Sequence, residues 1–236
     1  MRYTFNCLLL SLIISFLYLF TLYTHPIYDG NTYFSLAKRE EYRLDETSFK
    51  VYLIAPRENN IFLNELTSYH LKLKGEEQLE ILDSIFLSDI YFDRFKYYLY
   101  EIEFKLPTVT EGIYYDVTLV VFYQDLKIKF SLGDFYFKNQ NYYELGPSFI
   151  IKEGDIFKIS LNFNKSDVYV YLNANSILSY LKNGKLVIET DFLCLGKNYI
   201  KILYEYGMSY YSFYNNKCSK NLLDYRAYLR EGDILG

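Results

Sequence analysis

Alternation of apolar and polar side chains, position by position, is the feature of this chain that most constrains its fold. The clearest stretch covers residues 100–106 (YEIEFKL), and two others cover residues 126–132 (LKIKFSL) and 157–163 (FKISLNF). Successive side chains of a β-strand point to opposite faces, so each stretch predicts a strand with one face on a core and the other in water. Strands of this kind build antiparallel sheets.

Shorter segments rich in β-branched and aromatic residues add further strand candidates. They cover residues 49–54, 69–73, 117–123, 168–172, 185–189 and 199–206. Many short strands without long helical patterns between them indicate a sandwich or a barrel and not a parallel sheet. We therefore predict a mainly β chain, with two antiparallel, sandwich-like domains behind an N-terminal transmembrane helix.

The alternation stops at residues 138–147, where asparagine and glutamine residues are followed by a Gly-Pro pair. Such residues mark a connection between folded segments. We therefore expect a first β-sandwich over residues 48–140 and a second β-rich domain over residues 141–236. Residues 31–47 are polar and contain good helix formers, which predicts a juxtamembrane spacer or a short helix.

Two segments of the second domain carry signals of short helices. Asn175 is placed to cap a helix over residues 176–182, which an Asn-Gly pair would end. Ser219 is placed to cap a C-terminal helix over residues 220–230. The second domain is therefore expected to combine strands with these two helices.

One strand candidate is preceded by residues 111–117 (EGIYYDV). This segment resembles the tyrosine corner of immunoglobulin-like and fibronectin-like β-sandwiches, in which a Gly-x-Tyr turn opens a late strand, and Gly112 and Tyr114 match that turn. The resemblance implies an immunoglobulin-like sandwich over residues 48–140, with the Tyr114 phenol bonded back to the backbone. The second cysteine of the family would fall at Asp116, so the resemblance is to its cysteine-free members.

No full charge occurs between Arg2 and Asp29, and residues 5–23 (FNCLLLSLIISFLYLFTLY) are almost all apolar. At about 1.5 Å per residue, a helix over this run is close in length to a hydrocarbon core of about 30 Å. The residues directly behind the run lack the pair of small residues that a signal-peptide cleavage site needs. We predict that residues 1–30 hold a permanent single-pass anchor; the alternative is a cleaved signal segment and a secreted protein.

The few charges near this anchor predict its orientation. Arg2 and the amino terminus precede it, whereas the Lys-Arg pair at 38–39 is balanced by the Glu-Glu pair at 40–41. Positive charges favour the cytoplasmic side of a membrane. We therefore expect a cytoplasmic N-terminus and an extracytoplasmic bulk.

Composition and motifs argue against several kinds of activity. The formal net charge is -4 and the Lys-Arg pair is the longest basic cluster, so we expect no binding to nucleic acid. The two histidines, His25 and His70, and the lack of phosphate-binding, zinc-protease or nucleophile-elbow motifs predict no metal, no cofactor and no enzymatic activity. A carbohydrate- or lipid-processing enzyme, with Glu101 and Glu103 as paired carboxylates, is the alternative.

Cys194 and Cys218 are the two cysteines outside the apolar run. Two thiols are too few for a disulfide scaffold or a four-cysteine zinc site. In an oxidising compartment they could form a single structural disulfide, which is the expected state, with two free buried thiols as the alternative.

Tyrosine is unusually abundant, with 29 residues, and four of them lie on a predicted hairpin: Tyr204, Tyr206, Tyr210 and Tyr214. A phenol combines a flat apolar face with a hydroxyl group, so an exposed row could bind a glycan or a protein, unless it packs within the sheet. The expected function is a membrane-anchored, extracytoplasmic binding module of the cell envelope or surface. The alternative is a non-catalytic single-pass subunit of a larger membrane assembly.

Overall fold

The structure is a computed structural model. It describes Ser11 and residues 30–56, 61–92, 94–138, 147–153, 156–163, 165, 167–173, 175–191, 193–205, 207–226 and 228–235. Within these residues, no helix combines the length and the apolar character that crossing a bilayer requires. Apart from Ser11, the predicted anchor at residues 5–23 lies outside the described residues.

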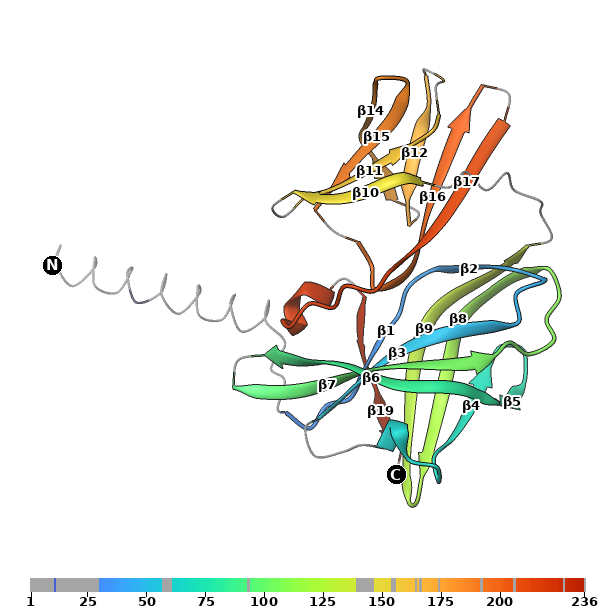
Figure 1. Ribbon diagram of the computed structural model, residues 1–236. Helices are drawn as coiled ribbons and strands as arrows, with labels where there is room; N and C mark the ends of the chain where they lie inside the picture. Colours follow the sequence, from blue (N-terminus) through green and yellow to red (C-terminus); the bar gives the residue numbers. More distant parts are fainter. Residues whose placement is uncertain are drawn as a thin grey trace, which may run out of the picture.

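The first sandwich consists of two sheets that pack face to face (Figure 1). One sheet has the order β18-β1-β3-β7-β6, with β1 Phe34–Leu36, β3 Ser48–Pro56, β6 Ile81–Phe92, β7 Phe95–Lys105 and β18 Leu229–Glu231. The other has the order β19-β9-β8-β4-β5, with β4 Ser68–Lys72, β5 Glu76–Gln78, β8 Gly112–Tyr123, β9 Leu126–Lys138 and β19 Asp233–Leu235. In addition, β2 Glu40–Arg43 pairs in parallel with β9, and a short 3-10 helix, η1 Ile61–Leu63, precedes β4.

The second sandwich is also built from two sheets. One has the order β10-β11-β15-β14, with β10 Pro147–Glu153, β11 Ile156–Leu161, β14 Ser179–Lys182 and β15 Lys185–Thr190. The other has the order β13-β12-β16-β17, with β12 Tyr169–Leu172, β13 Asn175–Ile177, β16 Gly196–Tyr204 and β17 Gly207–Asn215. The prediction of a mainly β chain with antiparallel sheets is therefore confirmed, and the alternating segments fall in β7, β9 and β11.

Both sandwiches share one strand order, although their sequences show no repeat. Leaving out β2, the strands β1 to β9 and β10 to β17 can each be counted from first to eighth along the chain. In both sets the first, second, sixth and fifth strands form one sheet, and the eighth, seventh, third and fourth form the other. The chain thus contains the same topology twice.

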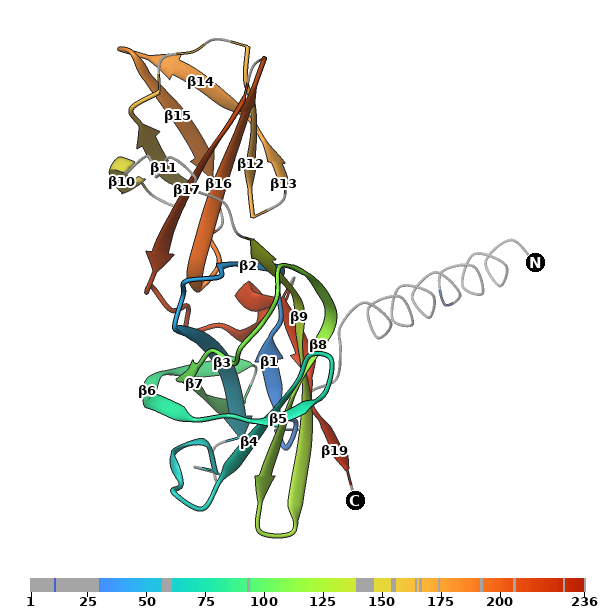
Figure 2. The same cartoon turned by 90° about the vertical axis from the view of Figure 1, so that its right-hand side faces the viewer.

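Each sandwich has its own apolar core. In the first, Tyr100, Ile102 and Phe104 of β7 pack with Leu119 and Phe130 from the opposite sheet. The sequence alternation explains this arrangement, because these side chains occupy one face of β7 while the glutamates between them face the other way. Figure 2 shows the second sandwich standing at one end of the first.

The chain returns to the first sandwich after β17. A 3-10 helix, η2 Leu222–Tyr225, packs Leu222 and Tyr225 on the outer face of the first sheet, in a cluster with Phe34 and Leu99. Strand β18 then pairs with β1, and β19 pairs with β9. The last strands of the chain therefore extend both sheets of the first sandwich.

The predicted C-terminal helix at residues 220–230 is wrong. Asn221, and not Ser219, caps the four-residue η2 by accepting a hydrogen bond from the Leu223 N–H at 3.1 Å. Strand pairing with β1 begins at Leu229. Burial of apolar side chains and backbone pairing outweigh the modest helix propensity of this segment.

The predicted helix at residues 176–182 is also wrong, because this segment belongs to strands β13 and β14. The Asn183-Gly184 pair has positive φ values, 52° and 73°, and forms the tight turn between β14 and β15. Asn-Gly suits both the end of a helix and a hairpin turn. Pairing with β15 decides between them, since it satisfies the backbone groups within a sheet.

Residues 31–47 are not a helix or a polar spacer, because they contribute β1 and β2. The pairing of Glu40–Arg43 with β9 runs from Glu40 opposite Phe135 to Arg43 opposite Lys138. Tyr42 of β2 lies in the first core and stacks on Phe137 at a ring-centroid distance of 5.4 Å. Side chains of β2 are buried at alternate positions, but the sequence does not show this because three of its four residues are charged.

Candidate binding site at the junction of the two sandwiches

Two lysines hold the sandwiches together. Lys38 of the first sandwich donates from Nζ to the carbonyl oxygens of Leu195 at 3.1 Å and Lys197 at 2.6 Å. Lys197 of the second donates from Nζ to the carbonyl oxygen of Glu41 at 3.0 Å and to the Glu46 carboxylate at 2.7 Å. Charge-assisted hydrogen bonds of this kind are among the stronger ones in proteins. Because each sandwich supplies one donor, the contact fixes the orientation of both.

A buried carboxylate accompanies this contact. Glu40 lies 3.1 Å from Lys38 Nζ, and the exposed fractions of the two side chains are 10% and 7%. Burial raises the pKa of Glu40, because loss of water disfavours the carboxylate more than Lys38 and Lys197 favour it. The junction therefore contains a buried titratable group beside charged neighbours.

Gly196 of the second sandwich lies close to the side chain of Tyr52 in the first. Its φ is 82°, and a Cβ atom at this position would lie 2.6 Å from the ring of Tyr52. The Tyr52 phenol donates to the Glu101 carboxylate at 2.8 Å, and Lys50 Nζ contacts the other oxygen of that carboxylate at 2.5 Å. Glu101 is thus held as a structural ion-pair partner on the sheet face, not as a free member of a catalytic pair.

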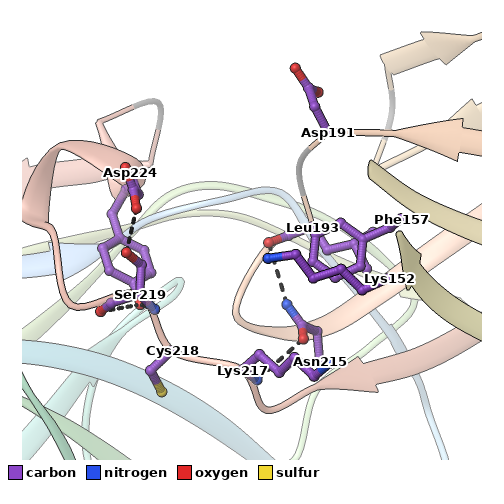
Figure 3. A pocket seen from close by; sticks show the side chains of 10 residues that line it. Lys152, Phe157, Asp191, Leu193, Asn215, Lys217, Cys218, Ser219 and Asp224 are labelled. Carbon is purple, nitrogen blue, oxygen red and sulfur yellow. Dashed lines mark hydrogen bonds between the residues drawn. The ribbon is translucent and has the colours of Figure 1, made fainter. Parts of the chain in front are cut away.

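A pocket of about 420 Å³ opens beside this junction (Figure 3). Its lining combines one end of the second sandwich with η2 and the segment that leads to it. The lining residues are Lys152, Phe157, Asp191, Leu193, Asn215, Lys217, Cys218, Ser219, Asp224 and Tyr225. In Figure 3, Phe157 and Leu193 lie on one side of the pocket, and Ser219 and Asp224 lie on the other. The volume falls within the range of about 300 to 1,000 Å³ that is typical of small-molecule sites.

Hydrogen bonds fix the walls of this pocket. Asn215 donates from Nδ2 to the carbonyl oxygens of Leu193 at 3.4 Å and Cys194 at 3.2 Å, and its Oδ1 accepts from the Lys217 N–H at 3.2 Å. The Tyr225 phenol accepts from the Ser219 N–H at 2.6 Å. These hydrogen bonds hold Asn215 and Tyr225 in place. The walls of the pocket are therefore formed before a ligand binds.

Four exposed side chains supply charge to the pocket: Lys152, Asp191, Lys217 and Asp224. Lys152 Nζ lies 5.3 Å from the ring centroid of Phe157. The pocket therefore offers an apolar floor from Phe157 and Leu193 together with ammonium and carboxylate groups. Such a lining can hold a ligand that carries both C–H faces and hydroxyl or charged groups.

Of the four tyrosines predicted to form a binding row, the structure describes the side chains of Tyr204 and Tyr214. Tyr204 and Tyr214 lie at opposite ends of the β16–β17 hairpin, opposite Gly207 and Lys197. Tyr204 is partly buried, and its ring centroid lies 5.6 Å from that of Phe163. Tyr206 lies outside the described residues, and so does the side chain of Tyr210.

Tyr214 instead reaches the junction. Its side chain is 55% exposed, and burial together with the negative charge of Glu46 raises the pKa of Tyr214 to about 12. It is therefore a protonated phenol at neutral pH, close to the acidic residues of the first sandwich. Tyr214 directly precedes Asn215, which lines the pocket.

Cys194 and Cys218 are both free thiols, so the expected disulfide is absent from the structure. Cys194 is buried, accepts a hydrogen bond from Asn173 Nδ2 at 3.2 Å, and has a pKa raised by burial. Cys218 lines the pocket. The two thiols differ in their surroundings, because Cys194 is buried whereas Cys218 is partly exposed at the pocket.

The segment that resembles a tyrosine corner makes the corresponding contact. The Tyr114 phenol donates to the carbonyl oxygen of Thr110 at 3.2 Å and lies 3.3 Å from the Thr110 N–H, which donates to it. Gly112 has a φ of 152°, a conformation that glycine adopts most readily. This contact ties the start of β8 to the preceding loop.

Among the described residues, no group of three or more histidine, cysteine, aspartate or glutamate side chains is arranged to hold a metal ion. No protein-family model and no curated protein matches the chain. A solved structure from Bacteroides ovatus, the mixed-linkage glucan utilization locus protein SGBP-B in complex with a mixed-linkage heptasaccharide, aligns with 11% identity and a TM-score of 0.23. The alignment covers 75% of this chain and 43% of that one, and is too distant to define a shared fold.

Proposed function

We propose that this protein is a non-catalytic binding module, in which two coupled sandwiches hold a polar ligand in the pocket at their junction. The observation that supports the proposal is the origin of the pocket walls. Phe157, Asp191 and Leu193 come from the second sandwich, whereas Tyr225 belongs to η2, which packs on the first. A site made by two units at a fixed junction is a common position for ligand binding.

We further propose that both sandwiches are immunoglobulin-like. In that fold one sheet carries the strands A, B, E and D and the other carries G, F and C. The shared order of the first, second, sixth and fifth strands, and of the eighth, seventh, third and fourth, corresponds to this arrangement with an added C′ strand. Tyr114 near the start of β8, the seventh strand, has the position and the backbone bond of a tyrosine corner.

The ligand class that best fits the lining is a hydroxyl-rich molecule such as a glycan segment. The C–H faces of a sugar ring pack on apolar surfaces like that of Phe157, and its hydroxyl groups pair with carboxylate and ammonium groups like those of Asp191 and Lys217. The pocket is open to solvent at its charged rim, which leaves room for a chain to continue outward. A single sugar unit would then occupy the apolar floor.

The proposed place of action is the outside of a membrane, with residues 5–23 as the anchor. The uncharged apolar sequence supports this part of the proposal. Protease treatment of intact cells tests it. Cleavage of the sandwiches while the cytoplasm stays protected supports external display, whereas full protection of residues 48–236 contradicts it.

Isothermal titration of the full chain with neutral, aminated and carboxylated oligosaccharides tests the binding function. The variants Asp191→Asn and Lys217→Gln change exposed charged groups at the pocket without removing the hydrogen bonds that hold its walls. Lys182→Gln, at the exposed end of β14, is the matched control. We expect at least tenfold weaker binding for the rim variants and unchanged binding for the control. Equal binding by all three variants would place the ligand elsewhere.

A further inference from the structure

The edge strand β6 is unusual in length. Natural sheets limit unwanted pairing with very short edge strands, with lysine or proline on the edge, or with bulges. The edge strands β5, β13, β18 and β19 are three residues long, β14 has four, and β10 and β17 have seven and nine. In contrast β6 has 12 residues and is the longest edge strand of the described sheets. Its sequence, ILDSIFLSDIYF, contains no lysine, arginine, proline or glycine.

One end of this edge is already covered by the chain itself. The Tyr91 N–H donates to the carbonyl oxygen of Lys220 at 2.7 Å, and Tyr91 forms a parallel bridge with Asn221. Residues 81–86 at the other end pair with β7 on one side, and no described strand pairs with them on the other. The chain thus covers this edge at Tyr91 and leaves residues 81–86 open among the described strands.

The open half carries exposed apolar side chains. Ile81, Leu82, Ile85 and Phe86 are between 41% and 50% exposed. The ring centroid of Phe86 lies 5.6 Å from that of Tyr98 and 6.0 Å from that of Tyr100, so its outer side extends an aromatic surface. Two bulges bound a regular stretch at residues 83–86, where the backbone can accept a partner.

The charge next to this edge is negative. Ile85 and Asp83 lie opposite Glu101 and Glu103 across the ladder, on the outer face of the sheet. Lys50 lies between these carboxylates, and its Nζ atom is 2.5 Å from a carboxylate oxygen of Glu101 and 3.9 Å from one of Glu103. One ammonium among three carboxylates leaves an excess of negative charge, which a basic partner would complement.

We propose that residues 81–86 bind an extended segment of a partner protein by strand addition, with lysine or arginine alternating with apolar residues in that segment. Main-chain hydrogen bonds to the open edge would hold the partner backbone. Basic side chains of the partner would face Asp83 and Glu103 on the outer side of the sheet. Apolar side chains of the partner would lie beside Phe86 on the core side.

Amide hydrogen exchange of the full chain, with and without the synthetic peptide Lys-Val-Lys-Ile-Lys-Val-Lys, tests this proposal. We expect the peptide to slow exchange at residues 83–86, and the glutamate counterpart, Glu-Val-Glu-Ile-Glu-Val-Glu, to have no such effect. Equal protection by both peptides, or protection by neither, would overturn the proposal.

A pair of variants separates this edge from apolar surfaces in general. Ile85→Lys adds a charge to the exposed edge, and Leu181→Lys makes the same change on the exposed edge strand β14. We expect Ile85→Lys to weaken peptide binding at least tenfold and Leu181→Lys to leave it unchanged. If sedimentation of the unliganded chain instead shows a dimer that Ile85→Lys dissociates, the occupant is a second copy and the proposal is overturned.

Discussion

Lys38 Nζ donates a hydrogen bond of 2.6 Å to the backbone carbonyl of Lys197, a residue of the other sandwich. The side chain of Lys197 returns across the same junction to the carbonyl of Glu41. The two lysines therefore cross-link the sandwiches in both directions, and their exposed side-chain fractions are 7% and 11%. Two surfaces held in this way can shape one pocket between them.

Replacement of Lys38 by methionine is expected to destabilise the protein by about 3 to 5 kcal/mol, because it leaves Glu40 buried without its partner. Chemical denaturation measures this change. Lys182→Met, at the exposed end of β14, is the control and should alter stability by less than about 0.5 kcal/mol. A loss below about 1 kcal/mol for Lys38→Met would show that the junction does not depend on this contact.

Glu40 should make stability depend on pH. Its pKa is raised in the folded state, so between the ordinary and the raised value the folded protein binds more protons than the unfolded chain. The stability that Glu40 contributes is therefore fully present below about pH 4.3, and it is lost as the pH rises through the raised pKa. Lys38, Lys197 and Glu46 are the charged groups that act on it.

The difference in unfolding free energy between wild type and Glu40→Gln, measured across this pH range, isolates that contribution. We expect the wild type to lose unfolding free energy relative to Glu40→Gln as pH rises. A difference that stays constant with pH would mean that Glu40 titrates alike in the folded and unfolded states.

Gly196→Ala should destabilise the protein more than Gly184→Ala. Both glycines have positive φ, 82° and 73°, so both substitutions introduce backbone strain of about 1 to 2 kcal/mol. A Cβ at Gly196 would also collide with Tyr52, whereas nothing lies within 4 Å of one at Gly184. Thermal or chemical unfolding of the two variants should therefore differ, and equal losses would argue against a close approach at Gly196.

Tyr114→Phe should cost about 0.5 to 1.5 kcal/mol, the net value of a typical hydrogen bond, because it removes the bond to Thr110. Tyr115→Phe is the matched control, since Tyr115 is exposed and its phenol lies in water. Unfolding free energies measured in parallel give the comparison. Equal stability of both variants would mean that the tyrosine-corner contact contributes nothing.

Much of the sheet structure could be predicted from alternation, because residues such as Ile102 and Phe104 occupy a half-buried face. The segment at 176–182 could not, since its Asn-Gly pair suits a helix end as well as the hairpin turn that the structure shows. The repeated topology was hidden because equivalent strands share no sequence pattern. Topology depends on pairing between distant segments, which local periodicity does not record.

The candidate site was harder to find in the sequence. Its lining residues are separated by up to 73 positions, from Lys152 to Tyr225, and meet only because the chain turns back after β17. Lys38 and Lys197 look like ordinary solvated lysines until the sandwiches are placed together. The abundance of tyrosine on the β16–β17 hairpin suggested a binding row, but Tyr204 and Tyr214 lie at opposite ends of this hairpin.

The location of ligand binding tests the central proposal most directly. Amide chemical shifts of the isotope-labelled full chain should be recorded during titration with the oligosaccharide that binds most tightly in calorimetry. We expect the largest changes on residues 191–193 and 215–225, around Phe157 and Asn215. Changes confined to other surfaces, or no response to any oligosaccharide, would contradict the junction pocket as the binding site.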